Sequence, residues 1–110
     1  MQITISGHHV SVNESMRSRA YEASQKLFRF FDGITNIAVK MEVDSSQCIA
    51  EFTVLARQSV TLTSKAKARD MRKALDEATE KIERQLTKRK EKLHDHRGHG
   101  AKRPSTSDQE

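Results

Sequence analysis

The chain is poor in the residues that form disulfides, tight turns and aromatic cores. Among 110 residues it has one cysteine, one proline, four glycines, one tyrosine and no tryptophan. The single cysteine, Cys48, excludes an internal disulfide and is typical of proteins in a reducing compartment. Because only 35% of the residues are hydrophobic, we expect one lean core built from aliphatic side chains and four phenylalanines.

Membrane and targeting segments are also missing. No apolar run approaches the length of a membrane span, and the N-terminus shows neither a secretory signal nor a transit segment. These absences predict a cytoplasmic protein.

Signals for catalysis are equally weak, so we expect no enzyme, no metal and no cofactor. The chain has no glycine-rich phosphate loop and no carboxylate pair placed for acid–base work. Cys48 falls on a predicted core face, where a buried thiol is the better interpretation than a nucleophile. His94, Asp95, His96 and His99 carry ligand atoms, but the glycines beside them give no fixed geometry for a metal.

Positive charge is what the chain has in excess. Charged residues make up 32% of the chain, the net charge is +5, and the pI is about 9.6. Fourteen of the 20 lysines and arginines lie between Lys65 and Arg103. A basic field concentrated in one part of the chain indicates an anionic partner such as nucleic acid.

Hydrophobic periodicity predicts the order β-α-β-β-β-α. The strands are expected at residues 1–6, 37–43, 48–55 and 60–65, and the helices at 14–31 and 70–96. Asn13 is the expected N-cap of the first helix and Asp32-Gly33 its stop, with Phe30 and Phe31 closing its buried stripe. Gly7 and His8 are expected to break the first strand. Together these elements predict an α+β fold, a four-stranded mixed sheet with two helices packed on one face.

The second helix carries segregated charge. It has no Gly or Pro, Asp70 is a plausible N-cap, and its apolar stripe is Met71, Leu75, Ala78, Ile82, Leu86 and Leu93. One flank is basic, with Lys81, Arg84, Lys88 and Lys92, and the far side is acidic, with Asp76, Glu80, Glu83 and Glu91. At roughly 1.5 Å per residue this helix is about 40 Å long, so we expect its last turns to project past the sheet.

This pattern resembles the ribosome hibernation promoting factor family, which includes the ribosome-associated translation inhibitors. The likeness covers about residues 1 to 95 and is carried by MQITISG at the start, LFRFFDGITN from Leu27, AEFTV from Ala50 and RDMRKALDEATEKIERQLTKRKEKL from Arg69. Members of that family bind the small ribosomal subunit between head and body, in the channel of messenger and transfer RNA. The resemblance therefore implies a factor that blocks translation and preserves idle ribosomes in starvation or stationary phase.

The resemblance also implies a short member of the family. Short members help a ribosome-dimerising factor pair ribosomes, whereas long members carry an extra C-terminal domain that pairs them directly. Three departures leave the effect on ribosome pairing unassigned. Arg72 stands where short members usually have an aromatic, and residues 65–69 are basic rather than acidic or glycine-bearing. The tail is neither absent nor strongly acidic, so it matches neither short subtype. We expect a ribosome-binding domain at 1–96 and a disordered polar and basic tail at 97–110.

The expected ribosomal RNA contacts are cations of the two helices: Lys26, Arg29, Lys81, Arg84, Lys88, Arg89, Lys90 and Lys92. Lys or Arg that neutralises phosphates releases condensed counterions. Arg89 and Lys90 lie off the basic flank. They can reach ribosomal RNA only where the end of the helix extends past the sheet. Few aromatics are available for stacking, so we expect recognition of shape and phosphate. Two alternatives stay open: a double-stranded RNA-binding domain, and a basic adaptor that binds an acidic protein.

Overall fold

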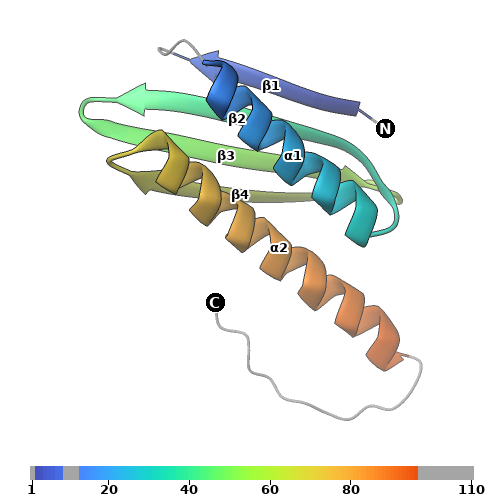
Figure 1. Cartoon of the computed structure of the whole chain (residues 1–110). Helices are drawn as coiled ribbons and strands as arrows, with labels where there is room; N and C mark the ends of the chain where they lie inside the picture. The colour runs from blue at the N-terminus through green and yellow to red at the C-terminus, as the bar shows by residue number, and fades with distance from the viewer. Residues whose placement is uncertain (1, 9–12, 97–110) are drawn as a thin grey trace.

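The computed structural model describes residues 2–8 and 13–96, with side chains described as far as Arg89. The order is β1 (Gln2–His8), α1 (Glu14–Phe30), β2 (Ile34–Asp44), β3 (Gln47–Ala56), β4 (Val60–Ala68) and α2 (Met71–His96). The strands lie in the order β1-β2-β3-β4, with β1 parallel to β2 and the other neighbours antiparallel. Both helices cover the same face of this sheet (Figure 1). This confirms the predicted α+β fold, and a strand ahead of α1 argues against the double-stranded RNA-binding domain.

The core lies between the sheet and the helices. Because strand side chains alternate between faces, every second residue of β2 and β3 points toward the helices. These residues, Ile37, Val39, Met41, Ala50, Phe52 and Val54, are at most 1% exposed. Facing them are residues of α1 and α2 at helical spacing, among them Ala20, Leu27, Leu75, Ala78 and Ile82. Burial of this one set fixes the register, since a one-residue slip would turn a whole strand inside out.

Local signals define both ends of α1. The Asn13 side-chain oxygen accepts a hydrogen bond from the Met16 N–H at 2.8 Å, which confirms Asn13 as the N-cap. The helix ends at Phe30, and Gly33 adopts a φ of +90°, a conformation that favours glycine. The Gly33 carbonyl accepts a hydrogen bond from the Arg57 N–H at 2.9 Å, so the α1–β2 and β3–β4 turns are joined.

Several strands are longer than predicted. The strand β1 continues through Gly7 and His8, which pair with Met41 and Glu42, so the expected break at Gly7 is wrong. Likewise, β4 continues past residue 65 to Ala68, which pairs with Cys48. The physical reason is the same in both cases: a long neighbouring strand offers hydrogen-bond partners that local sequence does not reveal.

The expectation that Phe30 is buried is wrong. Its side chain is 55% exposed, whereas Phe31 is partly buried against the core. The buried stripe runs through Ala20, Ser24 and Leu27, and a step of four from Leu27 leads to Phe31. Phe30 therefore falls about 100° to one side of the stripe.

None of the helices in the described part of the chain is long and apolar enough to cross a membrane. The predicted tail, residues 97–110, lies outside the described residues.

Candidate nucleic-acid interface

Helix α2 is anchored along one face and open along the other. Its stripe residues Leu75, Ala78 and Ile82 are fully buried, and Leu86 is 5% exposed. The sequence prediction missed Ala74, which is also fully buried. Because the packed helix is already ordered, binding a partner requires no further ordering of its backbone. The charges of its exposed side chains therefore act together on that partner.

The last turns of α2 project away from the sheet, as predicted (Figure 1). Arg89 lies seven residues after Ile82, so it shares the angular position of that buried residue, yet it is exposed. The nine residues of β4 span about 30 Å, less than the 26 residues of α2. Leu93, Lys90 and Lys92 fall where side chains are not described.

The basic flank of α2 borders the edge strand β4. The Lys81 ammonium donates a hydrogen bond to the Lys65 carbonyl at 2.9 Å, and the Gln85 amide donates to the Thr63 carbonyl at 2.6 Å. These two side chains cover carbonyls on the outer edge of the sheet. Lys81 keeps its charge and two further N–H donors.

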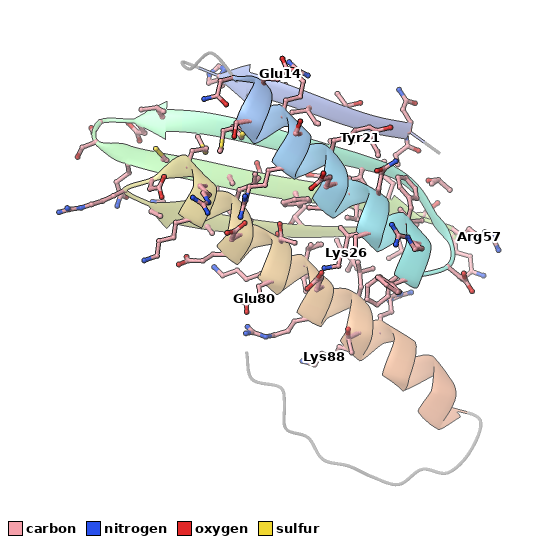
Figure 2. All side chains as sticks on the ribbon, in the orientation of Figure 1. Glu14, Tyr21, Lys26, Arg57, Glu80 and Lys88 are labelled. Carbon is pink, nitrogen blue, oxygen red and sulfur yellow. The ribbon has the colours of Figure 1, made fainter. Side chains whose placement is uncertain are left out.

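The structure brings three of the predicted cations into one row. Lys81, Arg84 and Lys88 are exposed and lie at steps of three and four on the flank beside β4, with Lys88 labelled in Figure 2. We call these three residues the α2 basic row. Their spacing suits neighbouring phosphates of a polyanion, and Arg84 can fork onto a phosphate where the lysines act as point charges.

The opposite flank of α2 is acidic and faces α1. The Arg19 guanidinium donates to both carboxylate oxygens of Asp76, at 3.0 and 3.2 Å. These hydrogen bonds, and then the charge attraction of Asp76, raise the pKa of Arg19 above its ordinary value. Glu83 shares the flank of Asp76 because it lies seven residues, about two turns, further along the helix. Glu80 lies one turn before Arg84 and borders the basic row instead. Thus the acidic flank of α2 is paired with a cation of α1, while the basic row lies on the other side of the helix.

Lys26 and Arg29 do not join the α2 basic row. Lys26 lies seven residues after Arg19 and therefore on the flank of α1 that faces the acidic side of α2. The body of α2 separates both α1 cations, which are exposed, from the row beside β4. The two helices do lie side by side, but they offer two separate basic surfaces rather than one continuous patch.

One further cation was missed because β4 is longer than predicted. Lys67 is exposed on the face of β4 opposite the helices, next to Ile49 in the register. Ser64 and Ala66 alternate inward with Lys65 and Lys67 outward, and this alternation was the available signal. The α2 basic row lies on the helix side of β4, and Lys67 adds positive charge on the other side of the same edge strand.

The described residues contain no group of three His, Cys, Asp or Glu that could hold a metal. Cys48 is partly buried against the core, and its thiol donates to the Arg69 carbonyl at 3.6 Å. That contact ties the start of β3 to the connection between β4 and α2, which is a packing role. His99 lies outside the described residues, as do the side chains of His94, Asp95 and His96.

Comparisons with known proteins agree on one family. The family model described as "Sigma 54 modulation protein / S30EA ribosomal protein" matches residues 3–94. The ribosome hibernation promoting factor of Pseudomonas putida is 38% identical over 92 residues, which cover 84% of this chain and 89% of that protein. The factor of the same name from Klebsiella oxytoca is 33% identical over 96 residues, 87% of this chain and 100% of that protein.

A solved structure agrees with this result. The structure of a ribosomal subunit interface protein from Coxiella burnetii covers 83% of this chain and 99% of its own, with a TM-score of 0.76 and 25% identity. The names of these proteins describe ribosome-associated factors, and neither of them names an enzyme. The chain therefore belongs to the S30EA ribosomal protein family, the family of the ribosome hibernation promoting factors.

Proposed function

We propose that this protein binds the small ribosomal subunit in the channel of messenger and transfer RNA. There it inhibits translation and preserves idle ribosomes under stress or in stationary phase. The relatives named as ribosome hibernation promoting factors support this role, and the name of the Coxiella protein places that relative at a ribosomal subunit interface. With ribosomes as its partner, the protein works in the cytoplasm.

The observation that carries the proposal is the one-sided charge of a projecting helix. Lys81, Arg84 and Lys88 line one flank of α2, while Asp76, and Glu83 seven residues after it, are turned to the other flank, toward α1. RNA carries closely spaced phosphates, so a polyanion is attracted to the β4 side and repelled from the acidic side. Such polarity orients the protein on RNA as well as holding it there. A small anionic substrate would contact only one or two of these cations, so a row of three favours a polyanion.

The proposed contacts form two groups. One group is on α2: Lys81, Arg84 and Lys88 on the β4 side, and Arg89, Lys90 and Lys92 on the projecting end. The other group is Lys26 and Arg29 on α1. Because the acidic flank of α2 stands between the groups, we propose that they contact different RNA segments, which a channel lined by RNA on several sides can supply.

Cosedimentation with purified small subunits through a sucrose cushion tests this function. We expect the protein to pellet with the subunits at moderate salt, and saturating messenger RNA with initiator transfer RNA to suppress this. Comigration that transfer RNA does not change would refute the proposed channel site. Absence of comigration would refute ribosome binding and favour an acidic protein partner.

A further inference from the structure

Phe30 is an exposed aromatic ring with a cationic partner. It is the last residue of α1, its side chain is 55% exposed, and the Arg29 guanidinium lies 5.7 Å from the ring centroid. This contact holds a planar cation and a planar ring together at the end of a rigid helix. Burial does not explain the ring, because Phe31 takes the core position beside it.

The ring lies beside α2 where that helix leaves the sheet. Phe30 follows Arg19 by eleven residues, about three turns, so it lies on the flank of α1 that faces α2. The two helices run in the same direction (Figure 1). Arg19 contacts Asp76, and Thr87 follows Asp76 by the same eleven residues. Phe30 therefore lies level with Thr87, close to the start of the projecting end.

Cations lie before and after the ring at this end of the molecule, together with the exposed carboxylate of Asp32. Lys26 lies one turn before Phe30 on α1, and Arg57 occupies the adjoining β3–β4 turn (Figure 2). The hydrogen bond from the Arg57 N–H to the Gly33 carbonyl holds that turn next to the end of α1. Nearer the start of the two helices, Glu83 places negative charge on the flank of α2 that faces α1. A phosphate is therefore attracted to this end and repelled from the space above it.

We propose that Phe30, with Arg29 over its ring, is a stacking site for one unpaired nucleobase. The base lies on the ring, and Arg29, Lys26 and Arg57 hold the phosphates of the same strand. Unstacked bases in RNA loops and bulges are bound on aromatic and guanidinium planes in this way. This inference rests on the proposed function, because the base belongs to ribosomal RNA. It adds a contact with a single-stranded base to an interface otherwise made of phosphate contacts.

The test uses two RNA hairpins, one with a single bulged adenosine and one fully paired, and the full-length chain. The F30W variant gives a direct signal, since the chain has no other tryptophan. We expect the bulged hairpin to quench the fluorescence of F30W and the paired hairpin to leave it unchanged. We also expect F30A to weaken binding of the bulged hairpin about tenfold and to leave the slope of affinity against salt unchanged.

The matched control is Y21A. Tyr21 is 46% exposed and lies nine residues before Phe30, on the opposite side of α1. Y21A should bind both hairpins as the wild type does. Equal binding by F30A and Y21A would overturn the proposal. So would an F30W variant that the bulged hairpin does not quench, even where F30A weakens small-subunit binding, because the ring then contacts a ribosomal protein.

The two proposals fail in different ways. A wild-type chain that prefers the bulged hairpin but does not sediment with small subunits keeps the stacking site and refutes the ribosomal function. A chain that sediments with subunits, with F30A equal to wild type on both subunits and hairpins, keeps the function and refutes the stacking site.

Discussion

Reversing two charges on the projecting end of α2 should abolish ribosome binding without unfolding the protein. The variant is K88E/R89E. Both side chains are exposed, and both follow Leu86, the last stripe residue whose burial is described. Surface substitutions of this kind change the free energy of unfolding by about 0.5 kcal/mol or less. Any large loss of binding therefore reports on the interface.

The size of the loss follows from electrostatics. A cation about 4 Å from a phosphate in water gains about 1 kcal/mol, and reversal turns that attraction into a similar repulsion. Each residue then costs about 2 kcal/mol and the pair about 4 kcal/mol, which weakens binding roughly a thousandfold. Loss of two phosphate contacts should also lower the slope of log affinity against log salt by about 2.

The assay is cosedimentation with small subunits over a range of salt concentrations, with circular dichroism to check folding. The control is R72E/K73E, which makes the same change in net charge on exposed residues in the first turn of the same helix. We expect the control to bind within a few-fold of wild type. If the control loses as much affinity as K88E/R89E, net charge rather than the projecting end governs binding. Retained binding by K88E/R89E would refute the assignment of these two residues.

Four further outcomes are expected. N13A should lower the free energy of unfolding by about 1 kcal/mol in thermal denaturation, because the Met16 N–H loses its cap; an unchanged melting temperature would contradict this. D76A should leave the midpoint of urea denaturation close to that of the wild type, because solvent screens its half-exposed bridge to Arg19; a large fall in the midpoint would contradict this. The raised pKa of Arg19 means that its contribution is complete below the unfolded-state value and lost only above it, so urea denaturation should show no Arg19-dependent change between about pH 6 and pH 9. A chain ending at His96 should pellet with small subunits as the full chain does, and lost binding would assign the function to the tail.

Much of the fold could be predicted because its signals are local. Alternation in β2 and β3, the Asn13 cap and the stop at Gly33 each act over a few residues, and each proved correct. Strand ends could not be predicted, because β4 continues to Ala68 only where β3 offers Cys48 as a partner. The exposure of Phe30 was missed because a stripe of about 3.6 residues per turn passes to Phe31 instead.

The sequence by itself determined the element order, the family resemblance and the separation of positive from negative charge on α2. Those properties depend on residue type and on spacing along one helix, which does not change on folding. Only the tertiary structure decided where each flank points. Burial of Leu75, Ala78 and Ile82 against the sheet fixes the rotation of α2. The basic row therefore lies beside β4, where Lys81 donates to a carbonyl, and Asp76 faces Arg19 of α1. As a result Lys26 and Arg29 form a second surface, because the body of α2 stands between them and the basic row.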